Sequence, residues 1–285
     1  MIVVSAATGH IGSELIKLLV SRNQEVIGLT SKQGHVSQIE KAGAKAAVID
    51  IFDTSKLRGL LNRADKFYLL NPPGDISGNP SQEERQSVQV LIDAVKNGTL
   101  KKIVAESTYG AQPGYELGDL DVLYELEKKL GSTSIPHEII RGAYYFSNWD
   151  MALESAEKQG KIYSFFPKDF NLPMVAPADI AKLAADRLID DEIQPLHYVE
   201  GPRHYSPQDV ADAFSDVLKK PVEVVEIPPQ DWENFMVSSG FSTAAAKSMA
   251  NMTQATLDTL ETPDSPTKGT TTLAEYVADL VRQSG

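Results

Sequence analysis

The sequence contains no cysteine and no apolar run long enough to cross a bilayer. Without cysteine the chain can form no disulfide, no thiolate metal site and no cysteine nucleophile, which fits a reducing compartment. The first residues, MIVV, lack a basic leader, so they are typical of a buried strand rather than of a signal peptide. We therefore expect a cytoplasmic protein that does not bind membranes.

Positive charge is also scarce. The sequence has 27 Lys and Arg residues against 39 Asp and Glu residues, and its formal net charge is −12. Phosphate backbones and anionic lipid surfaces are repelled on average by such a chain. The densest basic cluster, KNGTLKK at 96–102, stands at a predicted helix end, where lysines complement the helix dipole and stay solvated. We expect a small-molecule substrate, no nucleic-acid partner, and a monomer or homodimer.

What the sequence does contain is an alternation of short apolar segments and amphipathic segments. Apolar runs rich in Val and Ile predict strands at 2–5, 25–29, 46–49, 66–70, 102–105 and 138–141. The segments between them look helical, most clearly 82–96 and 120–130. Apolar strands that alternate with helices are typical of a parallel sheet covered on both faces. The sequence therefore predicts an α/β fold with a doubly wound parallel sheet of the Rossmann type.

The alternation changes after about residue 142. Helices are predicted at 148–158, at 177–189 and from Ser206 onward, and strands at 161–166, 196–201 and 222–228. Two or three further helices, a loop at 262–272 and a final helix follow. We expect a dinucleotide-binding domain over residues 1–150 and a smaller, mostly helical substrate region over 151–285, with the chain crossing back to the sheet.

The first predicted strand runs into the sequence AATGHIG at residues 6–12. A nucleotide turn needs backbone N–H groups at a helix N-terminus and small residues where the phosphates approach. Ala6 replaces the glycine usual at the tight turn, and we expect it to have a negative φ, since positive φ strains alanine. An ordinary strand-to-helix turn is the alternative. The predicted cofactor contacts here are Ala6, Thr8, Gly9, His10, Ile11 and Gly12.

The later strand ends supply further candidates, because ligands bind at the carboxyl edge of such sheets. After the second strand, no acidic residue is present to hold a free ribose 2′-OH. Two hydroxyls and an ammonium stand there instead, and they favour a 2′-phosphate and hence NADP. NAD is also possible, and Lys32 can be a solvated loop residue. Asp53 can cap a helix that starts near Thr54. The predicted cofactor contacts at these strand ends are Thr30, Ser31, Lys32, Asp50, Ile51, Asn71, Pro72, Ser107 and Thr108.

These segments together resemble the NmrA-like branch of the atypical short-chain dehydrogenase/reductases. The segments ATGHIG, DIFD, LNPP, VAESTYGA, IPHEIIRGAYYFSNW, VAPADIAKLAADRL and TTTLAEYVADL stand in the family's order and span most of the chain. The resemblance implies an NAD(P)-binding Rossmann domain and a smaller carboxyl-terminal domain. Family members include NAD(P)H:quinone reductases, other small-molecule reductases and redox-sensing regulators without turnover. The chain departs from the pattern at Ala6 and at Thr30, where NADP-binding relatives often have arginine.

Short-chain dehydrogenases use a Tyr-x-x-x-Lys dyad, and Tyr124 and Lys128 match its spacing. That spacing places both side chains on one helix face, where the tyrosine passes a proton. However, the better register with the family matches Glu127 and Leu130 to its Glu-x-x-Leu pair and places Leu123 where a lysine or histidine is usual. We therefore interpret Tyr124 and Lys128 as a pair on the helix surface.

The catalytic group is not identified by the sequence, and Ser107, Tyr109 and Tyr144 remain as candidates. Tyr109, Tyr144, Tyr145 and Trp149 follow the fifth and sixth strands, where aromatic rings can stack on a flat substrate or pack two lobes together. The histidines lack metal-ligand spacing, so no metal is expected, and no G-x-S-x-G hydrolase motif occurs. The sequence favours an NAD(P)H-dependent reductase of a small quinone-like or carbonyl compound. The alternative is a non-catalytic NADP-binding redox sensor that acts through a protein partner.

Overall fold

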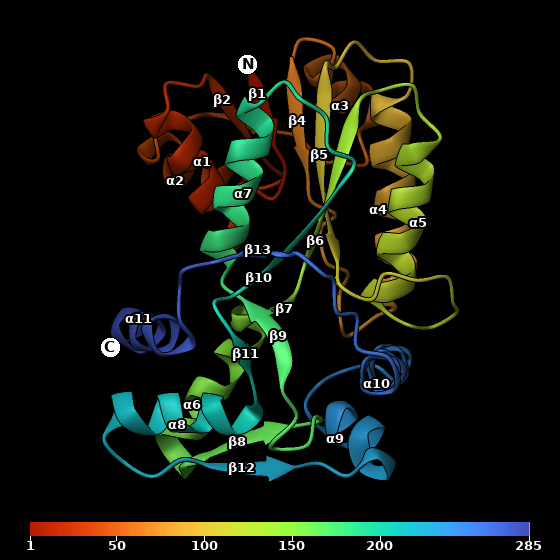
Figure 1. Ribbon diagram of the computed structural model, residues 1–285. Helices are drawn as coiled ribbons and strands as arrows, with labels where there is room; N and C mark the ends of the chain where they lie inside the picture. The colour runs from red at the N-terminus through yellow and green to blue at the C-terminus, as the bar shows by residue number, and fades with distance from the viewer. Residues whose placement is uncertain (285) are drawn as a thin grey trace.

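The computed structural model describes residues 1–284 and shows a large sheet with a smaller lobe beneath it (Figure 1). Over these residues eight strands form the large sheet in the order β13-β10-β6-β5-β4-β1-β2-β3, and all neighbours are parallel. Its strands are β1 (Ile2–Val4), β2 (Val26–Thr30), β3 (Lys45–Val48), β4 (Lys66–Leu69), β5 (Lys102–Thr108), β6 (His137–Gly142), β10 (Leu196–Glu200) and β13 (Thr267–Lys268). The predicted Rossmann-type α/β fold is confirmed.

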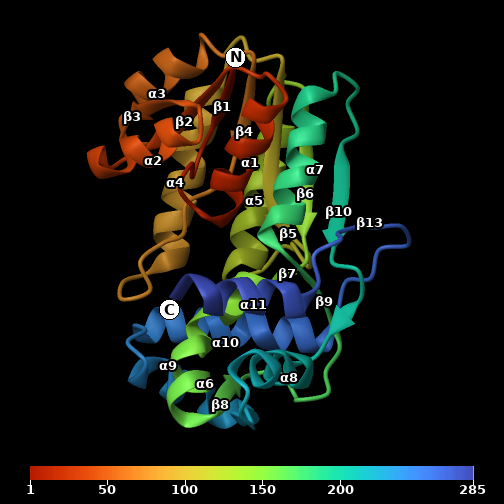
Figure 2. The same cartoon turned by 90° about the vertical axis from the view of Figure 1, so that its left-hand side faces the viewer.

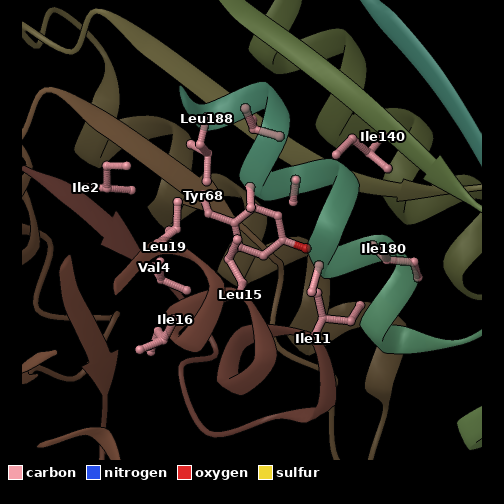
Figure 3. Packing of buried hydrophobic residues seen from close by; sticks show 14 of the residues in the cluster. Ile2, Val4, Ile11, Leu15, Ile16, Leu19, Tyr68, Ile140, Ile180 and Leu188 are labelled. Carbon is pink, nitrogen blue, oxygen red and sulfur yellow. The ribbon is translucent and has the colours of Figure 1, made fainter. Parts of the chain in front are cut away.

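Helices cover both faces of the sheet (Figures 1 and 2). One face carries α1 (His10–Ser21), α2 (Val36–Lys41) and α7 (Pro177–Ile189), and the other carries α3 (Thr54–Leu61), α4 (Pro80–Val95) and α5 (Asp119–Gly131). Figure 3 shows the first core, in which Tyr68 of β4 lies among side chains of α1 and α7. Because both faces are covered, the central strands are buried on both sides, and their apolar runs need no polar alternation.

The smaller lobe begins after β6 and has its own core. Three strands, β7 (Tyr144–Tyr145), β9 (Leu172–Val175) and β11 (His204–Tyr205), form one sheet, and β8 (Lys161–Ser164) pairs with β12 (Glu223–Glu226). Around them lie α6 (Leu153–Gln159), α8 (Pro207–Leu218), α9 (Trp232–Ser238), α10 (Thr243–Asp258) and α11 (Leu273–Ser284) (Figure 2). Because α7, β10 and β13 belong to the large sheet layer, residues beyond 150 contribute to both lobes.

Local differences from the predicted elements have simple causes. The 148–158 helix is in fact a 3₁₀ segment, η2 (Phe146–Ala152), followed by α6. The predicted loop at 262–272 contains β13, which is only two residues long and therefore leaves no alternation pattern. We did not predict β9, whose sequence LPMV includes a proline, a residue that argues against a strand.

The expectation that the basic cluster is solvated is wrong for Lys102. Its side chain is 2% exposed, and Nζ lies 2.7 Å from Oε1 of Glu138, whose side chain is 0% exposed. The ammonium also donates to the carbonyls of Asp190 and Glu192, at 3.1 and 2.9 Å. The second carboxylate oxygen of Glu138 lies 2.9 Å from Nε2 of His197. The charge of Lys102 can be buried because one carboxylate and two carbonyl oxygens compensate it.

Candidate functional site

A cleft of about 570 Å³ lies along the carboxyl ends of β1, β2, β3 and β4. Its floor and rim are residues 5–8, 29–32, 35, 49–52, 70 and 72–74, and α4 contributes residues 83, 86, 87 and 91. The carboxyl edge of an open parallel sheet is where ligands bind in such folds. The cleft brings together these sequence-predicted residues: Ala6, Thr8, Thr30, Ser31, Lys32, Asp50, Ile51 and Pro72.

The amino end of α1 borders this cleft. Its N-cap is Gly9, which has an extended backbone and no side chain that could bond the first-turn N–H groups. These groups carry the positive end of the helix dipole and are available to an anion. His10, Ile11 and Gly12 form the first turn of the helix directly behind the cleft-lining residues 6–8. The backbone N–H groups at this helix end can therefore bind a diphosphate without the help of a basic side chain.

The backbone of the turn at residues 6–12 explains why residue 12 is glycine, and at Ala6 it differs from the prediction. A Cβ built on Gly12 would lie 2.2 Å from the carbonyl oxygen of Ala6, so only glycine fits there without a shift. Ala6 itself has φ of 48°, and the predicted negative φ is wrong. The left-handed conformation costs alanine about 1–2 kcal/mol. It is held by the bonds around it, since the Ala6 oxygen accepts the Gly9 N–H at 3.0 Å and the Ala7 N–H donates to Leu29 at 3.4 Å.

His35 is a cleft residue that the sequence analysis did not select. It ends the 3₁₀ turn η1 (Gln33–His35) after β2, and its Nδ1 lies 3.2 Å from Oγ1 of Thr8 and 3.3 Å from Oγ1 of Thr30. The imidazole therefore joins the first nucleotide turn to the end of the second strand, close to Lys32 in sequence. Only its position shortly after a strand end could have indicated this role, because no motif includes it.

The end of β3 provides polar and apolar surface together. Oδ1 of Asp50 accepts the N–H of Phe52 at 3.0 Å, and both residues line the cleft. The Phe52 side chain, which the sequence analysis did not select, is 53% exposed and offers a flat apolar face to a ring. Asp53 caps α3 by accepting the Lys56 N–H at 3.1 Å, so the predicted cap is confirmed.

Ser107, at the end of β5, is buried and bonds a half-buried network of charged side chains. Its Oγ donates to Oε1 of Glu127 on α5 at 2.6 Å. The same carboxylate receives two bonds from the Arg141 guanidinium, at 2.9 and 2.8 Å, and Arg141 also pairs with Glu261 at 3.0 Å. Ser107 and its neighbour Thr108 do not line the cleft. The network connects β5, β6 and α5 with the segment after α10.

The tyrosine candidates also have partners or packing. The Tyr109 hydroxyl donates to Oε2 of Glu200 at 3.1 Å, and burial, with the charge of that carboxylate, raises the pKa of Tyr109 well above its usual value. Tyr144 packs edge-on against Trp149 and Phe166, with ring centroids 6.2 and 5.6 Å apart, and burial raises the pKa of Tyr144 to about 12. The rings of Tyr144, Trp149 and Phe166 belong to the core of the smaller lobe. Their predicted role in stacking on a substrate stays a prediction.

A carboxyl group without a charged partner lies behind the ends of β4, β5 and β6. Glu106 of β5 is 1% exposed, and its two carboxyl oxygens lie at hydrogen-bond distance from the hydroxyls of Tyr68 and Tyr145, at 3.0 and 3.3 Å. Burial raises the pKa of Glu106 to about 8, so the carboxyl keeps its proton at neutral pH. Glu106 was not among the predicted site residues, although an acidic residue inside an otherwise apolar strand was a signal.

A family model described as the NmrA-like family matches residues 1–277. The chain belongs to the NmrA-like family. The NAD(P)H azoreductase of Xenophilus azovorans is 24% identical over 250 residues, which cover 87% of this chain and 85% of that protein. An NADPH-dependent quinone oxidoreductase from Escherichia coli has a similar structure, with a TM-score of 0.80 at 21% identity, covering 99% and 100% of the two chains. A triphenylmethane reductase of Citrobacter sp. has a TM-score of 0.80 at 18% identity, covering 99% of each chain.

In this NmrA-like chain the Tyr-x-x-x-Lys match does not reach the end of β5. Lys128 is exposed on α5, and the α5 side chain that bonds Ser107 is Glu127. Residues 1–284 hold no group of three His, Cys, Asp or Glu side chains suited to a metal ion. Over the same part of the chain, no helix combines the length and apolar character needed to cross a membrane.

Proposed function

We propose that the protein is an NAD(P)H-dependent reductase of small quinone-like or carbonyl compounds and that it uses NADP(H). The observation that carries this proposal is the cleft, which runs along four strand ends and meets the uncapped amino end of α1. Membership of the NmrA-like family supports it, and so do the named activities of the azoreductase and the quinone oxidoreductase. The absence of cysteine is in keeping with a cytoplasmic protein, and the charge of −12 argues against a nucleic-acid partner.

The sheet order sets the direction of the dinucleotide. If Asp50 and Phe52 hold the adenosine beside β2 and β3, and α1 holds the diphosphate, the nicotinamide half extends past β1 toward β4, β5 and β6. Bound there, the reduced nicotinamide would supply the hydride. Oδ1 of Asn71, at the end of β4, is buried without a hydrogen-bond partner among residues 1–284, so it suits an amide N–H donor. Residues 1–150 would then bind the cofactor and residues 151–285 the substrate, apart from the elements that return to the sheet.

We expect NADPH to bind at least about tenfold more tightly than NADH, since the end of β2 offers Thr30, Ser31, Lys32 and His35 and no carboxylate there to hold a free 2′-OH. Replacing Lys32 with Gln should weaken NADPH binding and leave NADH binding unchanged. Calorimetric titration of both cofactors measures the difference. Lys17→Gln is the matched control, because Lys17 is exposed and pairs with Glu14. Equal or tighter binding of NADH would contradict the NADP assignment.

Turnover is tested by following NADPH oxidation with a panel of quinones, azo dyes and aldehydes. We expect oxidation with quinone-like acceptors, because the half-buried Tyr144 and Tyr145 follow the end of β6, toward which the nicotinamide half would extend. The engagement of Ser107 with Glu127 and of Tyr109 with Glu200 favours the alternative, a non-catalytic redox sensor acting through a protein partner. Tight NADPH binding without oxidation across the whole panel would select that alternative.

A further inference from the structure

Reduction of a quinone, a carbonyl or an azo bond requires a proton as well as a hydride. After hydride addition the acceptor carries a negative charge on oxygen or nitrogen, and a positioned acid speeds its neutralisation. Ser107 and Tyr109 already donate to carboxylates. The hydroxyl of Tyr145, just beyond the ends of β5 and β6, also faces a carboxyl group, but this group, Glu106, is buried and has no charged partner within residues 1–284.

Tyr145 lies on the side of the sheet where the nicotinamide half would extend. Gly142 of β6 is in register with Thr108 of β5, and Tyr145 follows three residues later, just beyond both strand ends. Tyr145 is half-buried as a residue and packs against the same core cluster as Leu70, which lines the cleft. The position fits a group that touches a substrate placed beside the nicotinamide.

Counting hydrogens decides which tyrosine can give up a proton. When Glu106 is protonated, it donates that proton to one tyrosine oxygen and accepts from the other tyrosine. Tyr68 is fully buried, and Figure 3 shows its hydroxyl turned toward Ile11 and Ile180, which are apolar. If Tyr68 accepted the proton of Glu106, its own hydrogen would lose the one hydrogen-bond partner that its hydroxyl has within residues 1–284, at a substantial cost. Tyr68 therefore donates to Glu106, Glu106 donates to Tyr145, and the Tyr145 hydrogen turns outward.

We propose that Tyr145 gives the proton to the reduced acceptor and that Glu106 positions Tyr145 and restores its proton. The inference rests on the reductase function proposed above. The O–H bond of Tyr145 breaks as a new O–H or N–H bond forms on the hydride-bearing acceptor. The proton of Glu106 passes to the Tyr145 oxygen, and solvent then reprotonates the carboxylate. Tyr145 is thus a catalytic residue, and Glu106 is a positioning residue that acts through it.

The pH dependence follows from the surroundings of Glu106. Tyr68 faces it from β4 and Tyr145 from β7, and α7 presents Ile180. Beyond Tyr145 stands Asp119 at the start of α5, and, besides burial, its charge contributes to raising the pKa of Tyr145. Burial raises the pKa of Glu106 to about 8, against the lowering effect of the hydrogen bonds with Tyr68 and Tyr145, and the relay needs the protonated form. Quinone turnover should therefore fall as the pH rises through about 8.

Two acceptors of different chemistry separate proton transfer from hydride transfer. A quinone needs both, whereas a cationic triphenylmethane dye takes a hydride and becomes neutral without any proton. Tyr145→Phe should lower kcat for the quinone about 100-fold or more. It should leave kcat for the dye within about twofold, since no proton is transferred. Tyr163→Phe is the matched control, because the Tyr163 hydroxyl donates to Gln159 and β8, which carries Tyr163, lies at the far end of the smaller lobe (Figure 1), so neither rate should change.

Glu106→Gln provides the second test. Its amide can still donate to the Tyr145 oxygen but cannot restore a proton, so quinone kcat should fall and the decline near pH 8 should disappear. Equal loss with both acceptors in Tyr145→Phe, or no loss with the quinone, would overturn the relay. A selective quinone loss in Asp119→Asn but not in Tyr145→Phe would identify Asp119 as the donor instead. If the wild-type protein reduces neither acceptor, the reductase proposal fails and the relay fails with it.

Discussion

Replacing Gly12 with alanine is expected to weaken NADPH binding about 10- to 100-fold and to destabilise the fold by about 1–3 kcal/mol. The added Cβ would lie 2.2 Å from the Ala6 oxygen, which is backbone and cannot swing away. Either the turn or the first turn of α1 must shift. Each N–H bond to a phosphate lost in that shift is worth about 1.5–3 kcal/mol, which gives the expected loss of affinity.

Gly59→Ala is the matched control for this change. Gly59 lies in α3, and a Cβ there meets nothing within 4 Å. Alanine should therefore stabilise the helix by about 0.5–1 kcal/mol and leave NADPH binding unchanged. Denaturant titration and calorimetry on both variants give the comparison. An unchanged NADPH affinity in Gly12→Ala would show that the amino end of α1 does not hold the diphosphate.

The sequence predicted those parts of the fold that local patterns determine. The strands β1 to β6 and the turn at residues 6–12 follow from short apolar runs and from small residues after the first of them. The conformation of Ala6 could not be predicted in this way, since it depends on bonds that close the turn and tie it to β2. β13 could not be predicted because a two-residue strand is defined only by its neighbour β10.

The candidate site was predictable at its strand ends but not in its hydrogen bonding. Positions after β1, β2 and β3 line the cleft, since the carboxyl ends of parallel strands meet at one edge. The partners of Ser107 and Tyr109 come from α5 and from β10, and nothing in the local sequence of β5 indicates them. Glu106 meets Tyr68 and Tyr145 for the same reason: the contacts join residues distant in the chain. Chemistry that depends on such contacts becomes visible only with the fold.

The buried pair of Lys102 and Glu138 should control stability rather than activity. Lys102→Met is expected to lower the free energy of unfolding by about 3–5 kcal/mol, because it leaves the Glu138 carboxylate buried without its main counter-charge. Lys45→Met is the control: Lys45 pairs with Glu25 in an exposed position, where ion pairs contribute little. Denaturant titration of both variants, with circular dichroism as the probe, measures the difference.

A second variant separates lost charge balance from lost packing. In Lys102→Met with Glu138→Gln no charge is left buried, while the glutamine oxygen can still accept from the Gln194 N–H, which bonds Glu138 at 3.0 Å. We therefore expect the double variant to be more stable than Lys102→Met alone, although the bonds from Lys102 to Asp190 and Glu192 are lost in both. Equal instability of the two variants would mean that these carbonyl contacts, and not the carboxylate, account for the effect of Lys102. The pair lies at the start of β5, at the edge of the sheet opposite the carboxyl edge that carries the cleft. We therefore expect the folded fraction of either variant to bind NADPH with unchanged affinity.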